Sequence, residues 1–185
     1  MIPIIILEGP DGAGKSHLAK RLSLHFDMPI APKSMDGEVK PLVDMKSWIE
    51  TCISKKFQSV IYDRFALISG PLYAPILKDQ YQLNAYQDIP WMFKQHWQFY
   101  TQVRPIIVYC LPPLQVVKDN LKKDDSNQVI EQYIEQIYVA YVNRAALDSG
   151  YSTSFLFNYT AKPSEFDFEK LINFIADTLR IKGLR

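Results

Sequence analysis

The chain alternates between short runs of apolar residues and longer stretches in which apolar residues return every three or four positions. Short β-branched runs are typical of strands buried on both faces of a parallel sheet, and the longer pattern is typical of helices with one buried face. This alternation predicts a three-layer α/β fold, with a parallel sheet between two layers of helices. The predicted strands are residues 2–7, 29–31, 59–62, 106–111 and 155–157.

The longer stretches predict the helices of the two outer layers. These helices are residues 15–26, 42–57, 88–100, 114–121, 130–150 and 164–179. A loop rich in glycine and proline, residues 69–75, is expected after the strand at 59–62. Because no repeat or low-complexity linker interrupts the alternation, residues 1–185 are expected to form one domain.

The first strand runs directly into a glycine-rich segment, residues 9–16, that reads Gly-Pro-Asp-Gly-Ala-Gly-Lys-Ser. This segment, here called the phosphate loop, lies between a strand and a helix, the context in which its backbone N–H groups can surround phosphates. Lys15 is expected to reach the β- and γ-phosphates, and the Ser16 hydroxyl to coordinate Mg²⁺. The alternative is a glycine-rich turn that matches by chance. The predicted ATP-binding residues are Gly9, Asp11, Gly12, Ala13, Gly14, Lys15, Ser16 and His17.

Composition changes this picture little. The 185 residues are 48% hydrophobic and 22% charged, with a formal net charge of +1, so nothing favours a nucleic-acid partner. No apolar run is long enough to span a membrane, and the first residues do not show a basic region followed by a cleavable apolar run. Cys52 and Cys110 lack metal-ligand spacing and are expected to be buried thiols in a reducing compartment. These features predict a cytoplasmic protein, and the phosphate loop makes small-molecule nucleotides its expected partners.

Asp63 and Arg64 follow the strand at 59–62. In a parallel sheet, the carboxyl ends of the strands share one edge, so this pair is expected near the phosphate loop. There the Asp63 carboxylate can bind Mg²⁺ or accept a proton, and Arg64 can hold a second anion. A surface salt bridge at the strand end is the alternative interpretation.

Asp11 is an acid inside a loop expected to hold an anion. Because it would repel the bound phosphates, its side chain is expected to point away from them, toward an acceptor whose sugar hydroxyl it can bind. A turn-forming aspartate after Pro10 is an equally good interpretation.

The segment from Glu8 to Ser16, together with Asp63-Arg-Phe-Ala-Leu-Ile-Ser-Gly70, resembles the thymidylate kinase family of nucleoside monophosphate kinases. The resemblance implies a five-stranded parallel core, Mg²⁺ as cofactor, and transfer of the ATP γ-phosphate to a deoxynucleoside monophosphate such as dTMP. It also implies that Asp11 binds the sugar 3′-hydroxyl, that Arg64 binds the acceptor phosphate, and that the chain can form a homodimer. Further acceptor contacts are expected from Lys33, Ser69, Gly70 and Tyr73.

The chain departs from that family at three places. Ala13 stands where some members carry a catalytic arginine, and the expected lid, residues 121–127, offers only Lys122 and Lys123 as its replacement. Lys33 is the nearest counterpart of the family's arginine after the second strand. Residues 38–48 contain neither the phenylalanine nor the arginine that the family offers to thymine, so the acceptor base is left open.

Two other functions are alternatives to a monophosphate kinase. A deoxynucleoside kinase of the same fold class would need an acid after the second strand, and none occurs before Asp36. A nucleotide-gated ATPase or binding module would need no acceptor. The aromatic helix at 91–100 could stack a base, form a dimer face or pack in the core. The histidines have no metal-ligand spacing.

Overall fold

The computed structural model describes residues 3–31, 59–77, 88–123, 128–160, 163–181 and 183. Within them, the central sheet contains β1 (Ile4–Glu8), β2 (Val60–Asp63), β3 (Ile106–Cys110) and β4 (Ser154–Phe157). The strands are all parallel and lie in the order β2-β1-β3-β4. β1 is therefore flanked by a strand on each side, which places the phosphate loop in the middle of one sheet edge.

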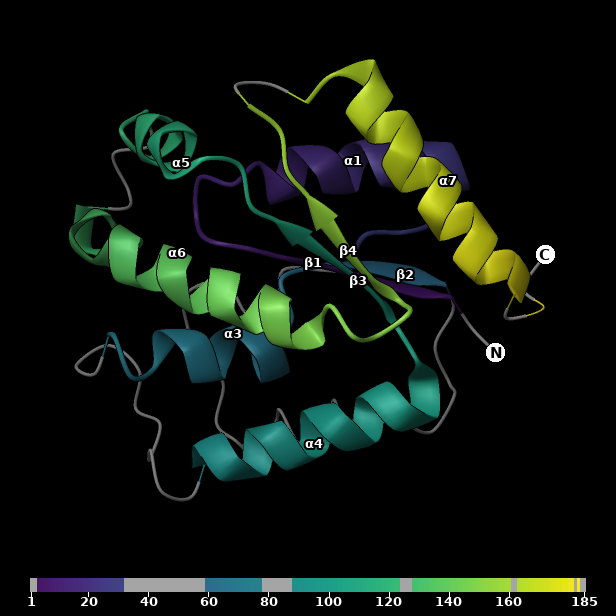
Figure 1. Ribbon diagram of the computed structural model, residues 1–185, viewed down its shortest axis with the longest axis horizontal. Coiled ribbons are helices and arrows are strands. Elements are labelled where there is room, and N and C mark those ends of the chain that lie inside the picture. The colour runs from purple at the N-terminus through teal and green to yellow at the C-terminus, as the bar shows by residue number, and fades with distance from the viewer. Residues whose placement is uncertain are drawn as a thin grey trace.

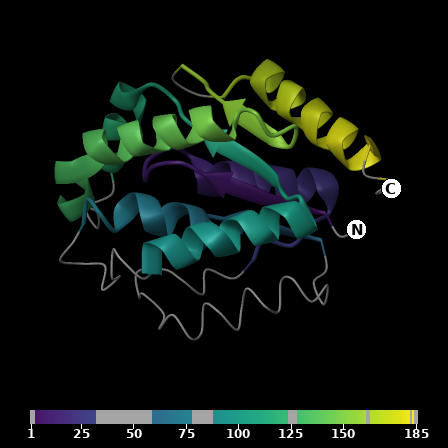
Figure 2. The same cartoon turned by 60° about the horizontal axis from the view of Figure 1, so that its bottom comes forward.

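Helices cover both faces of this sheet (Figures 1 and 2). The described helices are α1 (Lys15–Phe26), α3 (Ala66–Tyr73), α4 (Asp88–Val103), α5 (Leu114–Leu121), α6 (Gln128–Asp148) and α7 (Glu165–Ile181). Figure 1 shows α1 and α7 on one face, with α3, α4 and α6 on the other. The three-layer α/β prediction is therefore confirmed.

The alternation of side chains along β1 explains the two-sided core. Ile4 and Ile6 pack in a cluster that includes residues of α3, α4 and α6. Ile5 and Leu7 point the other way and pack with α1 and α7. Because every residue of β1 is buried, the strand has to be apolar throughout, apart from its last residue.

The expected fifth strand is the first correction. Residues 29–31 form only an isolated parallel bridge between Ile30 and Ile61, so the sheet of the described residues has four strands. Backbone hydrogen bonds join Pro29 O to Ile61 N and Ala31 N to Ile61 O. Proline lacks an N–H donor, and Pro29 sits inside this short segment, which limits it to one bridge at the outer side of β2.

The expected loop at 69–75 is the second correction, because α3 begins at Ala66 and continues through Gly70 and Pro71 to Tyr73. Gly70 and Pro71 both weaken a helix, but α3 is buried along most of its length. Packing of Leu67 and Ile68 against the core outweighs the low helix propensity.

The other helix predictions agree with the structure. α1 and α5 have the predicted bounds, and α4, α6 and α7 differ from prediction by a few residues at their ends. Ser164 caps α7, accepting a hydrogen bond from the Asp167 N–H at 3.1 Å while Asp167 accepts one from the Ser164 N–H at 3.0 Å. The predicted helix at 42–57 lies outside the described residues, as do Cys52, Lys33 and residues 124–127 of the expected lid.

Cys110 is buried as expected, and burial raises the pKa of its thiol to about 12. A thiol with so high a pKa is an inert packing group at neutral pH. No helix of the described segments combines the length and apolarity needed to cross a membrane.

We predict that Gly9→Ala strongly destabilises the fold. Gly9 has a φ of +148°, and a Cβ added to it would lie 2.3 Å from the backbone oxygen of Cys110 in β3. Since two strands of the core would have to separate, we expect a loss of about 2–4 kcal/mol in the free energy of unfolding. Chemical denaturation measures this loss. Gly150→Ala is the matched control, since an added Cβ there meets nothing within 4 Å. Equal stability of the two variants would contradict the prediction.

Candidate active site

The phosphate loop is built on the turn from β1 to α1. Gly14 caps the start of α1 with a φ of +74° and a ψ of 13°, the left-handed conformation that glycine adopts without strain. Two side chains from distant parts of the chain hold the loop. The Tyr159 hydroxyl donates to Ala13 O at 3.1 Å, and the Asn120 amide donates to Gly12 O at 2.9 Å. Sequence analysis missed both residues, since neither belongs to a contiguous motif.

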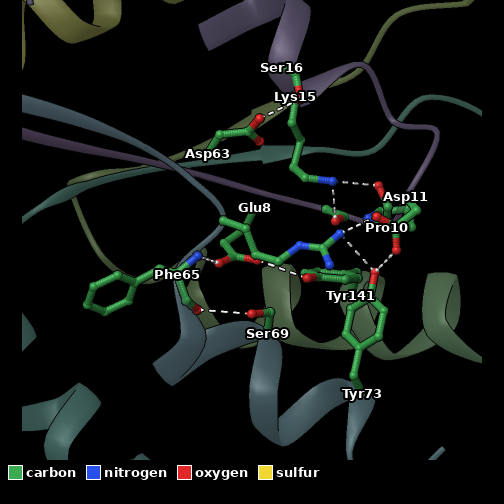
Figure 3. Close-up of polar contacts among 12 residues, drawn as sticks. Glu8, Pro10, Asp11, Lys15, Ser16, Asp63, Phe65, Ser69, Tyr73 and Tyr141 are labelled. Atoms are coloured by element: carbon green, nitrogen blue, oxygen red, sulfur yellow. Dashed lines mark hydrogen bonds and ion pairs between the residues drawn. The ribbon is translucent and has the colours of Figure 1, made fainter. Parts of the chain in front are cut away.

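Lys15 lies inside the loop rather than in solvent. Its ammonium group donates to the carbonyl oxygens of Gly9 at 2.9 Å and Pro10 at 2.7 Å (Figure 3). Burial lowers the pKa of Lys15, and the nearby Arg64 guanidinium adds to this effect. An anion in the loop would offer this ammonium group a stronger partner than two neutral carbonyls.

Ser16 and Asp63 meet across the sheet edge. The Ser16 hydroxyl donates to Asp63 Oδ2 at 2.5 Å (Figure 3). The pairing of β1 with β2 explains this contact, because Asp63 is the register partner of Leu7, two residues before the phosphate loop begins at Gly9. Hydroxyl and carboxylate oxygens are the ligands that Mg²⁺ prefers, and protein sites commonly supply only one or two of them beside substrate phosphates.

The described residues contain no cluster of three or more histidine, cysteine or acidic side chains that could hold a metal ion by themselves. Ser16 and Asp63 are the residues here that could hold a metal ion shared with a phosphate ligand.

Asp11, Arg64 and Tyr73 form a second polar group beside the loop. Arg64 Nη2 donates to Asp11 Oδ1 at 2.5 Å and to the Tyr73 hydroxyl at 3.2 Å. Tyr73 in turn donates to Asp11 Oδ2 at 2.8 Å (Figure 3). Burial opposes ionisation of Asp11, but Arg64 and Lys15 outweigh it and hold the pKa of Asp11 below its usual range. Both carboxylate oxygens of Asp11 are thus bonded, one by Arg64 and the other by Tyr73.

Glu8, the last residue of β1, was not predicted to be a site residue, yet it is fully buried beside Arg64. Its Oε1 accepts the Phe65 N–H at 2.6 Å, and its Oε2 accepts the Tyr141 hydroxyl at 2.9 Å. Burial raises the pKa of Glu8 to about 7, although Arg64 opposes this shift. A lone acid at the end of an otherwise apolar buried strand was the available sequence signal.

The remaining predicted acceptor residues are placed differently from one another. Ser69 is buried in α3, and its hydroxyl donates to Phe65 O at 3.2 Å. Gly70 is buried in the same helix. Only Tyr73 of these three reaches the Asp11 and Arg64 pair through a hydrogen bond among the described residues.

Cations available for the lid lie at the end of α5. Lys122 and Lys123 are exposed, and Lys123 Nζ donates to Asn120 Oδ1 at 3.3 Å. Because Asn120 also bonds the loop carbonyl of Gly12, Lys123 is two contacts away from the phosphate loop. Lys118 instead forms an ion pair with Glu135. His17 is exposed in the first turn of α1.

The aromatic helix α4 divides between core and surface. Phe99 is buried and its ring lies 4.9 Å from that of Phe65, while Phe93 and Trp97 are 45% and 56% exposed. His96 is buried on the same helix and contacts Arg144 at 3.0 Å. Arg144 also donates to Asp148 at 2.9 Å, so its guanidinium is already committed within the core.

The chain shares its fold with solved structures that include a deoxyadenosine kinase. It aligns with the YorR protein of Bacillus subtilis, solved in complex with phosphorylated GDP, at a TM-score of 0.69 and 22% identity, over 97% of this chain and 98% of that one. It aligns with deoxyadenosine kinase from M. mycoides, solved with the products dCMP and dCDP, at a TM-score of 0.60 and 17% identity, over 95% and 99%.

The same deoxyadenosine kinase with bound dCTP gives a TM-score of 0.59 and 18% identity, over 94% and 99% of the two chains. No protein-family model and no curated protein sequence matches this chain. At these sequence identities the likeness establishes the fold alone.

We predict that Glu8 makes the fold less stable as the pH rises. The pKa of Glu8 is about 7 in the folded chain and 4.5 for an unperturbed glutamate, so the folded state binds the proton more tightly. The stability this provides is complete below pH 4.5 and is lost as the pH rises through 7. The loss should amount to about 3 kcal/mol.

Unfolding measured from pH 4.5 to pH 8 for the wild type and for Glu8→Gln tests this, because other titrating groups cancel in the difference. The wild type should lose stability relative to the variant across this range. A difference that is independent of pH would contradict the prediction.

Proposed function

We propose that the chain is a Mg²⁺- and ATP-dependent kinase that phosphorylates a deoxynucleoside monophosphate, with dTMP as the acceptor that its resemblance to the thymidylate kinase family implies. The observation that carries the proposal is that two clusters of charged side chains lie next to each other at one edge of the sheet. Lys15 with the Ser16 and Asp63 pair forms the donor side, and Arg64 with Asp11 forms the acceptor side. Lys15 is close enough to interact electrostatically with Asp11, Asp63 and Arg64, so the two sides adjoin.

On the donor side, the phosphate loop and Lys15 would bind and orient the β- and γ-phosphates of ATP. The exchange of the Gly9 and Pro10 carbonyls for phosphate oxygens leaves the ammonium group of Lys15 fully paired. When bound, Mg²⁺ would be held by Ser16 and Asp63 and would neutralise charge on the phosphates. The carboxylate of Asp63 could also accept a proton during the transfer.

On the acceptor side, Arg64 would face the acceptor phosphate, and Asp11 would accept a hydrogen bond from a sugar hydroxyl. The Tyr73 hydroxyl bonds both side chains and so fixes their relative orientation. Phosphoryl transfer requires little covalent chemistry from the protein, so correct placement of donor and acceptor is most of the catalysis.

The solved structures with this fold support the proposal. Deoxyadenosine kinase from M. mycoides was solved with dCMP and dCDP, and the YorR protein with phosphorylated GDP. Nucleotides are thus the partners we propose for this chain, in the cytoplasm, without nucleic acid or membrane partners. The exposed Phe93 and Trp97 of α4 are the aromatic surface we propose for a homodimer.

Phosphorylation of a deoxynucleoside itself is the second candidate, and one contact favours it. Arg64 is already bonded to a carboxylate, so a doubly charged acceptor phosphate must compete with Asp11, whereas a neutral nucleoside need not. The deoxyadenosine kinase from M. mycoides, which has the same fold, supports this candidate as well.

ATP consumption measured with each nucleoside and each nucleoside monophosphate tests the proposal. We expect ADP release to depend on one acceptor class, with the base and sugar decided by the most active acceptor. Asp63→Asn is the matched inactive variant and should bind ATP within about tenfold of the wild type while losing far more than that in turnover. ADP release that is equal with and without every acceptor would instead indicate an ATPase.

We predict that Lys122→Ala combined with Lys123→Ala lowers turnover by about tenfold or more, with ATP affinity intact. A charge that meets the phosphoryl group mainly in the transition state affects turnover more than binding. Lys118→Ala is the control, since this lysine of α5 is paired with Glu135. Normal turnover in the double variant would exclude both lysines as the source of the transition-state charge.

A further inference from the structure

The backbone at Arg64 is unusual and has to be held in place. Its φ is +82°, in the left-handed region that side-chain-bearing residues rarely adopt. Two successive amides after β2 are fixed by β1. The Arg64 N–H donates to Leu7 O at 3.0 Å, and the Phe65 N–H donates to Glu8 Oε1 at 2.6 Å. The first contact continues the sheet, whereas the second depends on one side chain.

Glu8 is itself held from the far side of the site. Tyr141, fully buried on α6, donates to Glu8 Oε2 at 2.9 Å (Figure 3). The Tyr141 ring meets the Tyr73 ring edge-on at 6.0 Å, and Tyr73 bonds both Asp11 and Arg64. The contacts therefore close a ring from Glu8 through two tyrosines to Arg64 and back through the Phe65 amide.

The negative charge of Glu8 matters to this ring. The positive groups that face it are Arg64 and Lys15, and the other titratable groups near it are Tyr141 of α6 with Tyr109 and Cys110 of β3. A carboxylate accepts hydrogen bonds more strongly than a neutral amide of the same shape. Burying it is nonetheless unfavourable, because burial disfavours the charged form.

We propose that Glu8 is a positioning residue, whose carboxylate, held by Tyr141, fixes the Phe65 amide and thereby orients Arg64 toward the acceptor. The inference rests on the proposed function only in assigning an acceptor to Arg64. The proposed role of Glu8 concerns the acceptor side only, because Asn120 and Tyr159 hold the phosphate loop independently of Glu8. Loss of Glu8 should therefore weaken acceptor use while ATP binding is retained.

Glu8→Gln and Tyr141→Phe test the proposal by steady-state kinetics with the preferred acceptor. We expect Glu8→Gln to raise the acceptor KM and to lower kcat, with kcat/KM reduced about tenfold or more and ATP affinity within about twofold. Tyr141→Phe should act in the same direction with a smaller effect. Tyr138→Phe is the matched control, since it removes a 2.9 Å hydrogen bond from the same helix to Pro112 O and should change nothing.

The Phe65 amide provides a readout that does not depend on catalysis. In the wild type, its proton resonance should titrate with a midpoint near pH 7, the pKa of the carboxylate that it bonds. Glu8→Gln should abolish this titration. Tyr141→Phe should move the midpoint upward, since the Tyr141 hydrogen bond lowers the pKa of Glu8. Tyr138→Phe should leave the midpoint unchanged.

These measurements separate the two proposals. A wild-type chain that phosphorylates no acceptor would contradict the proposed function, and the Phe65 amide would still decide the role of Glu8. Wild-type KM and kcat in Glu8→Gln, or a Phe65 amide resonance that Glu8→Gln leaves unchanged, would overturn the positioning role. Should Glu8→Gln fail to fold, equal behaviour of Tyr141→Phe and Tyr138→Phe would overturn it.

Discussion

The parallel pairing of β1 with β2 is the constraint on which the site depends. It places Leu7 opposite Asp63, so the strand that leads into the phosphate loop ends beside the strand that leads into Arg64. Residues more than forty positions apart in sequence then lie within hydrogen-bonding distance, as Ser16 and Asp63 do. A shift in this register would move Asp63, Arg64 and the Phe65 amide together, and with them both sides of the site.

Charge is concentrated where the strands end. Glu8, Asp11 and Asp63 lie near Lys15 and Arg64, and several of these groups are buried. Burial raises the pKa of Glu8 and lowers that of Lys15, because it disfavours the charged form of each group. A site of this kind reduces stability in exchange for preorganised charge, and ligand phosphates are the groups best able to relieve it.

Sequence analysis predicted what contiguous residues determine. The phosphate loop, the alternation of strands and helices and the bounds of α1 and α5 follow from local spacing. It failed at α3, where tertiary burial overrides the helix-weakening Gly70 and Pro71, and at residues 29–31, where a proline limits pairing to one bridge. Glu8, Asn120 and Tyr159 act through contacts with distant residues, which no local pattern contains.

The hydrogen-bond partners of Lys15 and Arg64 affect which ligands the proposed site can select. Lys15 bonds neutral carbonyls, which compete weakly with a phosphate, so in the proposed kinase the donor side would open readily to a triphosphate. Arg64 bonds a carboxylate, which competes strongly, and the Tyr73 hydroxyl reinforces that pair. An acceptor phosphate would therefore have to bind Arg64 more strongly than the Asp11 carboxylate does. Alternatively, an acceptor hydroxyl could donate a hydrogen bond to Asp11 while the pair of Arg64 and Asp11 stays intact. Selectivity in the proposed kinase would then arise on the acceptor side, where binding exchanges one charged partner for another.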